Sequence, residues 1–257
     1  MSTIINSLKI VAFDSLLLHE GYESKRLRQV AKDIKDKDFL YNPPLATEIP
    51  GGKYLIIDGA HRVMSLKALK CKRIIVQVIE QKDFNVLSWD HLVPNDQWLS
   101  DLLKDNNFSI EKSQERRDLI AVITDYNKRK YFIYPKVEST KIEMIRCWNK
   151  LVDYYKNKYP VERINPDNQK NLLLHKSLLV SHVPWSFEEI IESVTNNNLL
   201  MPAGVTRFVI ENRLLNLNIP LSLLMEKEFS NDLWQELINN WNKSIRHYTS
   251  SVYVCDI

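Results

Sequence analysis

The 257-residue sequence is poor in cysteine and glycine and has no long apolar run. Its three cysteines, Cys71, Cys147 and Cys255, stand far apart without a C-x-x-C spacing, so we expect neither a disulfide framework nor a cysteine zinc site. No stretch approaches the roughly 20 apolar residues that span a bilayer, and residues 1–10 lack the basic and apolar regions of a signal peptide. We therefore expect a cytoplasmic protein with no membrane partner.

Charge and the common nucleotide-binding signatures exclude further classes. The formal net charge is only +3, and the basic residues are interspersed with acidic ones, which makes nucleic acid unlikely as the main partner. The sequence has no Gly-x-x-x-x-Gly-Lys-(Ser/Thr) P-loop and no protein-kinase signature, so any phosphoryl transfer must use another scaffold. Four histidines without metal-ligand spacing are assigned to the surface or to a satisfied core: His91, His175, His182 and His247.

The hydrophobic patterning predicts an α+β protein. In the N-terminal part we expect strands at 8–13, 45–49, 54–57 and 74–79, with helices at 26–35 and 63–70. From about residue 89 onward we expect a hairpin (119–124 with 131–134), a helix over 142–155, a helix opened by a capping box at 186–189, a second hairpin (205–210 with 214–217) and a helix at 232–245. We place a domain boundary near residue 86, giving domains 1–86 and 87–257.

The strongest local signal is the segment Asp58-Gly59-Ala60-His61-Arg62, between a predicted buried strand and a predicted helix. A glycine turn at this place exposes the first N–H groups of the helix, which together with the helix dipole suit a phosphate. His61 and Arg62 would add charge-assisted donors, and Asp58 could hold a Mg²⁺ ion that bridges phosphates. The local sequence equally allows Asp58 to cap the helix, with His61 and Arg62 on its solvated face.

Two weaker signals lie far away in the sequence. Gly204-Val205-Thr206-Arg207 repeats the layout Gly-x-(His or Thr)-Arg and could grip the other end of an anionic ligand, although a solvated Thr-Arg pair is the simpler interpretation. Glu20 follows a leucine-rich segment and could accept a hydroxyl proton. Taken alone, a solvent-facing loop glutamate explains it as well.

Several segments match a known superfamily. Residues 54–62, Tyr-Leu-Ile-Ile-Asp-Gly-Ala-His-Arg, resemble the signature of the ParB and sulfiredoxin superfamily. Further segments are similar to its free-serine kinases, and most to the staphylococcal branch encoded with staphyloferrin B biosynthesis: His19-Glu20, residues 65–69, residues 161–164 and above all residues 202–208. The resemblance covers nearly the whole chain, and Gly-Val-Thr-Arg is its most specific part.

This resemblance implies a fold and an activity. The fold would be a ParB/sulfiredoxin-like N-terminal domain and a mixed α/β C-terminal domain, with the active site in the cleft between them. The activity would be transfer of the γ-phosphoryl group of ATP, or of a phosphoryl group of ADP, with Mg²⁺, to free L-serine. The product O-phospho-L-serine would supply L-2,3-diaminopropionate for a siderophore. The resemblance leaves a homodimer possible.

The resemblance also assigns roles by position. Glu20 would be the catalytic base, and Asp58 would act in transfer and hold the Mg²⁺ through the nucleotide phosphates. The remaining assignments are nucleotide and phosphate binding for Gly59, Ala60, His61, Arg62 and Arg207, and substrate binding for Asp33, Trp89, Arg163 and Thr206. Two positions depart from the family pattern. Ala60 replaces the sulfiredoxin cysteine, so that activity should be absent, and Asp33 replaces a small hydroxyl residue, which bears on amino-acid specificity.

Two alternatives from other classes stay open at this point. One is a ParB-like DNA-binding or haem-responsive regulator, against which stand the balanced charge and the lack of a helix-turn-helix with a basic recognition helix. The other is a nucleotide-binding structural protein that transfers nothing. The kinase interpretation makes one geometric demand: Glu20, Asp58 and the corner from Gly204 to Arg207 must face a common cleft.

Overall fold

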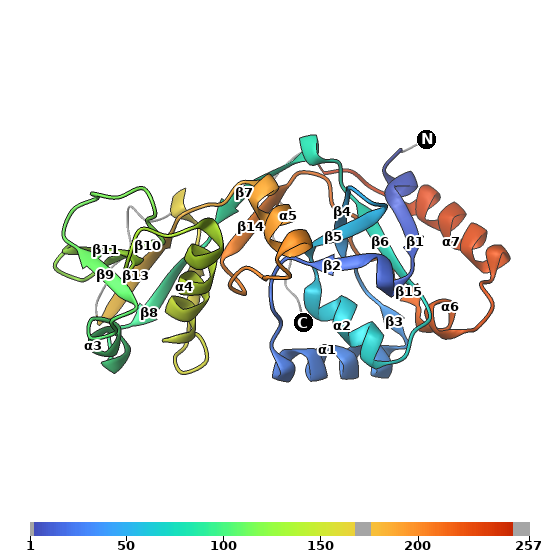
Figure 1. The fold of residues 1–257 in the computed structure, drawn as a ribbon. Coiled ribbons are helices and arrows are strands. Elements are labelled where there is room, and N and C mark those ends of the chain that lie inside the picture. Colours follow the sequence, from blue (N-terminus) through green and yellow to red (C-terminus); the bar gives the residue numbers. More distant parts are fainter. Residues whose placement is uncertain (1–2, 168–175, 249–257) are drawn as a thin grey trace.

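A two-stranded ladder joins the two lobes of the molecule (Figure 1). In the computed structural model, which describes residues 3–167 and 176–248, β7 (Phe84–Ser88) leads out of the N-terminal lobe and β14 (Thr206–Ile210) returns antiparallel to it. The predicted boundary at residue 86 falls inside β7, and the chain after β14 lies with the N-terminal lobe (Figure 1). The division into 1–86 and 87–257 stays a prediction.

The N-terminal lobe is built on a five-stranded sheet. Its strands, in spatial order, are β1 (Leu8–Val11), β6 (Ile74–Val78), β4 (Leu45–Ile49), β5 (Lys53–Asp58) and β2 (Leu16–Leu18). Gly51 and Gly52, both at positive φ, make the tight turn between β4 and β5. Helices α1 (Ser24–Lys37) and α2 (Ala60–Ala68) lie side by side below this sheet (Figure 1).

Short elements complete this lobe. They are η1 (Thr3–Ser7), η2 (Phe13–Ser15), η3 (Gln81–Asp83), the strand pair β3 (Phe39–Leu40) and β15 (Ile219–Pro220), α6 (Leu221–Met225) and α7 (Asn231–Ser244). The segment that follows β14 packs against this lobe through buried apolar side chains: Leu214, Leu217 and Trp241 lie in the same apolar cluster as the buried residues of β6. The C-terminal part of the described chain thus belongs to the N-terminal core.

The second lobe is built on a six-stranded antiparallel sheet. Its strands, in spatial order, are β12 (Glu162–Ile164), β8 (Asp90–Pro94), β13 (Ser177–His182), β10 (Ala121–Thr124), β11 (Lys130–Pro135) and β9 (Phe108–Glu111). Its helices are α3 (Gln97–Leu102) and α4 (Lys141–Asp153), while α5 (Phe187–Asn196) lies at the junction, where Phe187 packs against Phe84 of β7 (Figure 1). The predicted capping box is confirmed, since Ser186 and Glu189 each accept a bond from the other's backbone N–H.

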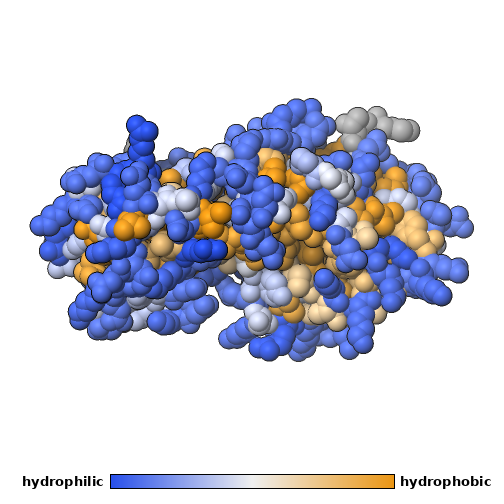
Figure 2. Space-filling view, in the orientation of Figure 1, coloured by the Kyte–Doolittle hydropathy of each residue, from blue (hydrophilic) through white to orange (hydrophobic). Residues whose placement is uncertain are grey.

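One apolar cluster crosses the junction between the lobes. It runs from Leu55 and Ile57 of β5, through Phe84 of β7, to Trp148 and Tyr155 of the second lobe. Hydrophilic residues cover most of the face seen in Figure 2, which is notched between the two lobes on its lower edge. Because the lobes share core residues, the junction is a packed interface.

Most predicted elements are confirmed, and the mixed α/β class agrees with the prediction. The hairpin of 205–210 with 214–217 is wrong: β14 pairs with β7, more than 100 residues away, and 214–217 is not a strand. The helix predicted from residue 63 begins earlier, at Ala60. None of the helices within residues 3–167 and 176–248 combines the length and the apolar composition that a membrane-spanning helix requires. His175 and Cys255 lie outside the described residues.

Candidate active site

A pocket of about 720 Å³ brings together most of the predicted site residues. It is lined by Glu20, Asp33, Asp58, Gly59, Ala60, His61, Arg62 and Arg163. These residues come from the end of β2, from α1, from the turn between β5 and α2, and from β12 of the second lobe. Glu20 and Asp58 therefore share one pocket, which is part of what the kinase interpretation demands; the third member, the corner from Gly204 to Arg207, is not among the residues that line it.

Glu20 is tied to the Gly204 corner. A parallel bridge pairs Glu20 with Met201, and the Met201 N–H donates to the carbonyl oxygen of His19 at 2.8 Å. The carboxylate Oε2 of Glu20 then accepts the N–H of Gly204 at 2.5 Å. The side chain of Glu20 is 20% exposed, so it is partly shielded yet open to the pocket. A loop glutamate that merely faces solvent is excluded by these contacts.

The turn between β5 and α2 leaves a helix N-terminus without a side-chain cap. Gly59 is the N-cap residue, with φ of 92°, and among the described residues no side chain accepts a bond from the first N–H groups of α2. Asp58 therefore does not cap the helix and instead pairs with Arg62, at 2.8 Å, and with Arg213. Burial raises the pKa of Asp58, but the charges and hydrogen bonds of the two arginines outweigh it and hold this pKa below its usual value.

The contacts of Arg62 and His61 differ from the predicted charge-assisted hydrogen bonds to phosphates. Arg62 Nη1 donates to the carbonyl oxygens of Asn42 and Pro43, each at 2.9 Å, so the guanidinium clamps the loop before β4. His61 Nε2 accepts the N–H of Glu23 at 3.0 Å, which requires this nitrogen to be unprotonated. Burial, followed by the charge of Arg26, lowers the pKa of His61. The ring is neutral, so it is no charged donor, and its part in phosphate binding stays a prediction.

Other cations that sequence reasoning missed reach the same pocket. Arg26 and Lys37 of α1 line it, as does Arg213 of the returning chain. Lys156 lies next to it: its Nζ donates to the carbonyl oxygen of Ala203 at 2.6 Å, and burial lowers its pKa. No local motif marks these residues, because only the folded chain brings Arg213 to Asp58, 155 positions away.

Three predicted residues lie outside the pocket lining. The guanidinium of Arg207 stacks 4.6 Å from the ring centre of Trp89 and donates to the Asn165 side chain at 2.6 Å. Thr206 is paired with Ser88 in the β7–β14 ladder. Thr206 and Arg207 belong to the corner from Gly204 to Arg207, and Trp89 adjoins it, since the N–H of Trp89 donates to the carbonyl oxygen of Val205 at 2.7 Å. Arg207 is therefore grouped with the predicted substrate residues and lies apart from the turn between β5 and α2.

Acidic side chains would have to hold the predicted Mg²⁺. No group of three or more metal-ligating side chains occurs among residues 3–167 and 176–248. Magnesium is commonly held by one or two carboxylates together with substrate phosphates. Asp58, which faces the pocket beside the uncapped end of α2, suits such a shared site. Asp33 lines the pocket from α1 and accepts a bond from Gln29 at 2.9 Å.

Comparisons with known proteins find similar L-serine kinases, although no family model matches the chain. The ATP-dependent L-serine kinase SbnI of Staphylococcus aureus is 32% identical over 258 residues, which spans the whole of both proteins. An ATP-dependent L-serine kinase of Staphylothermus marinus is 28% identical over 146 residues, covering 52% of this chain and 58% of that protein.

Solved structures agree with these matches. A C-terminally truncated SbnI from Staphylococcus aureus superposes with a TM-score of 0.79 at 31% identity, covering 95% of this chain and 97% of the other. A free serine kinase in complex with AMP has the same fold, with a TM-score of 0.68 at 18% identity over 85% of this chain and 93% of the other. The chain belongs to the family of ATP-dependent L-serine kinases.

Proposed function

We propose that this protein transfers the γ-phosphoryl group of ATP to the hydroxyl of free L-serine, giving O-phospho-L-serine and ADP. The observation that carries the proposal is one pocket lined by Glu20 and Asp58, in which Glu20 is bonded to Gly204 across 184 positions of sequence. The names of the relatives from Staphylococcus aureus and Staphylothermus marinus support the same reaction. They give no support to a DNA-binding or haem-responsive regulator.

In this reaction Glu20 takes the proton from the serine hydroxyl. The serine oxygen forms a bond to the γ-phosphorus, and the bond from that phosphorus to the bridging oxygen breaks, so that ADP leaves. The Gly204 N–H holds the carboxylate of Glu20 in place while this happens. Most of the acceleration would come from positioning and charge neutralisation, as in other phosphoryl transfers.

The nucleotide phosphates would lie at the turn between β5 and α2. The uncapped N–H groups after Gly59 and the positive end of the helix dipole suit an anion. Arg26 and Arg213 face the same space and add positive charge. Asp58 would hold the Mg²⁺ of the nucleotide, and that ion would neutralise charge on the transferred phosphoryl group.

L-Serine would lie between Glu20 and the second lobe. Arg163 is exposed, lines the pocket and has no ion-pair partner in the described parts of the chain, so it can bind the serine carboxylate. Trp89, together with Thr206 and Arg207 of the corner from Gly204 to Arg207, would form the wall of the serine site on the side of the second lobe. Asp33 would face the serine ammonium.

The finer family properties are part of the same proposal. They are a ParB/sulfiredoxin-like N-terminal lobe, a cytoplasmic location and use of the product for L-2,3-diaminopropionate in siderophore synthesis. ADP as a second phosphoryl donor and a homodimer are also included. The AMP and ADP complexes of the fold neighbours are consistent with a nucleotide site in this fold.

The test is direct. Purified protein is incubated with L-serine, ATP and Mg²⁺, and O-phospho-L-serine is measured by mass spectrometry, with ADP as an alternative donor and with threonine and homoserine as alternative acceptors. Glu20→Gln should lower kcat by about 100-fold or more, because it removes the base, while nucleotide binding persists. Glu48→Gln, at an exposed site on β4, is the matched control. Wild-type protein that binds ATP but forms no phosphoserine would favour the structural-protein alternative.

A further inference from the structure

A chain of hydrogen bonds crosses the interior of the second lobe and ends at Gly204. Trp148 Nε1 donates to His182 Nδ1 at 2.8 Å, and His182 Nε2 lies 3.1 Å from the Tyr155 hydroxyl. That hydroxyl lies 2.9 Å from His91 Nδ1, and His91 Nε2 lies 3.1 Å from the carbonyl oxygen of Gly204. All four side chains are buried. They come from α4, the turn after it, β13 and β8.

Both ends of this chain fix the direction of its hydrogen bonds. An indole N–H can only donate and a carbonyl oxygen can only accept. His182 Nδ1 therefore carries no proton, and its Nε2–H donates to Tyr155. The single Tyr155 hydroxyl proton then donates to His91 Nδ1, and the His91 Nε2–H donates to Gly204. This arrangement needs both rings neutral. Burial provides for that, lowering the pKa of His91 to about 4 and that of His182 well below its usual range.

The Gly204 turn is held on both sides of its Cα atom. The carbonyl oxygen of Gly204 is fixed by His91, and the carbonyl oxygen of Ala203 is fixed by Lys156, the residue that follows Tyr155. The N–H between these two carbonyls donates to Glu20 Oε2 at 2.5 Å. The base therefore takes its position from a backbone segment that the second lobe holds.

We propose that His91, Tyr155 and His182 are positioning residues, which hold the Gly204 turn and, through its N–H, the Glu20 carboxylate in the geometry for proton transfer from serine. The inference rests on the proposed function for the role of Glu20. A buried polar chain is stabilising only when every member is satisfied, and an apolar cluster of similar volume would serve packing alone. Because this series of hydrogen bonds ends at the turn that holds Glu20, a positioning role explains why these buried side chains are polar.

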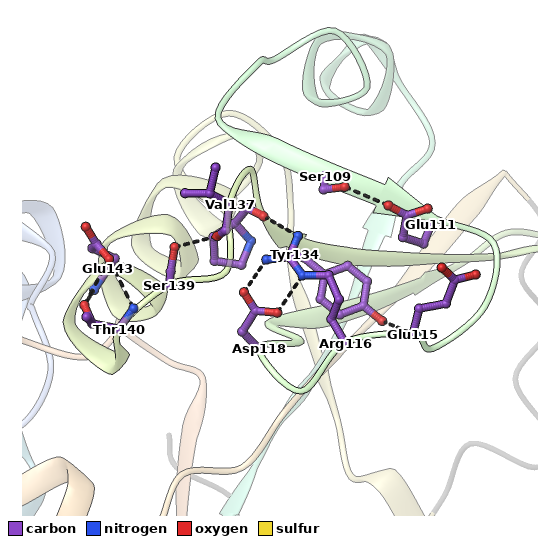
Figure 3. Close-up of polar contacts among 11 residues, drawn as sticks. Ser109, Glu111, Glu115, Arg116, Asp118, Tyr134, Val137, Ser139, Thr140 and Glu143 are labelled. Atoms are coloured by element: carbon purple, nitrogen blue, oxygen red, sulfur yellow. Dashed lines mark hydrogen bonds and ion pairs between the residues drawn. The ribbon is translucent and has the colours of Figure 1, made fainter.

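Tyr155→Phe tests this by removing one hydroxyl from the middle of the chain. The matched control is Tyr134→Phe on β11 of the same lobe, because Tyr134 is equally buried. Among the described residues, the one hydrogen-bond partner of its hydroxyl is the N–H of Glu115, which donates to it at 3.2 Å (Figure 3). Tyr155→Phe should lower kcat about tenfold or more through a misplaced base, with an unchanged KM for ATP. Tyr134→Phe should leave both constants within about twofold of wild type.

A second pair of variants covers the case in which Tyr155→Phe does not fold. Glutamine at position 91 can accept from Tyr155 through its oxygen and donate to Gly204 through its amide, whereas leucine can do neither. His91→Gln should therefore retain at least several times the kcat of His91→Leu. Equal activity of these two variants, or equal kcat losses in Tyr155→Phe and Tyr134→Phe, would overturn the inference.

A spectroscopic readout separates the inference from the proposed function. Ala203 is the only alanine followed by glycine, so labelling with ¹³C′-alanine and ¹⁵N-glycine selects the Gly204 amide alone. Its proton signal should shift in Glu20→Gln and in Tyr155→Phe but not in Tyr134→Phe. If the signal shifts in this way while the wild type makes no phosphoserine, the proposed function fails and the positioning network stands. An unchanged signal in Tyr155→Phe refutes the network itself.

Discussion

Replacing Gly59 by alanine should destabilise the turn between β5 and α2 by more than the unfavourable backbone conformation alone explains. Gly59 has φ of 92°, and a Cβ atom there would lie 2.7 Å from Nη2, 2.8 Å from Nε and 2.9 Å from Cζ of Arg62. Gly51 has φ of 86°, and a Cβ atom there would meet nothing within 4 Å. The two glycines therefore share the backbone strain and differ in the contact with Arg62.

The magnitudes follow from these two causes. A left-handed backbone costs an alanine about 1–2 kcal/mol, which is the whole expected effect of Gly51→Ala. In Gly59→Ala the guanidinium must also move, and hydrogen bonds to charged groups contribute about 1.5–3 kcal/mol each. Because the Arg62 side chain is 23% exposed and its partner Asp58 is 42% exposed, we discount the ion pair. With one such hydrogen bond lost, the total loss for Gly59→Ala should be about 2.5–5 kcal/mol.

Urea unfolding of the two variants measures this difference. A calorimetric titration with ATP and Mg²⁺ in native buffer adds the functional consequence: Gly59→Ala should bind at least about tenfold more weakly, since Asp58 loses a fixed partner, and Gly51→Ala should bind as the wild type does. Equal losses of unfolding free energy in the two variants would show that Arg62 yields without cost and would refute the reasoning.

Three further predictions concern other parts of the molecule. Arg213→Ala removes one of the two cations that contact Asp58, so the pKa of Asp58 should rise toward its usual value. The affinity for ATP, measured by calorimetry, should fall severalfold. An unchanged affinity would contradict a role of Arg213 in phosphate binding. Trp89→Ala should raise the KM for serine while the KM for ATP stays constant, and the opposite pattern in steady-state kinetics would move Trp89 out of the serine site. His91 has a folded-state pKa of about 4, below its usual 6.5, so the unfolded chain takes up this proton first as pH falls. His91 should therefore contribute a decrease of about 3 kcal/mol in the free energy of unfolding between pH 6.5 and 4, in addition to the decrease from His182. Chemical denaturation of His91→Gln should show a flatter profile in this window, and an unchanged profile would contradict the lowered pKa of His91.

The sequence determined the local elements that build the site. Residues 54–62 specify a buried strand, a glycine turn and a helix, because the apolar run, the glycine and the helix formers each act within a few residues. The same holds for the capping box at Ser186 and for the helix that begins at Ser24. Glu20 could be singled out as a candidate base by its place after a leucine-rich strand and by the family resemblance.

Tertiary structure decided which of these pieces meet. The pairing of β14 with β7, the return of residues 214–241 to the N-terminal core and the approach of Arg213 to Asp58 all join segments more than 100 residues apart. No periodicity in the sequence encodes such partners, because burial of shared apolar surface selects them only when the whole chain folds. For the same reason, the sequence predicts His91 and His182 only as surface or satisfied core residues. It gives no sign that the hydrogen bonds through them lead, by way of His91, to the turn that holds Glu20.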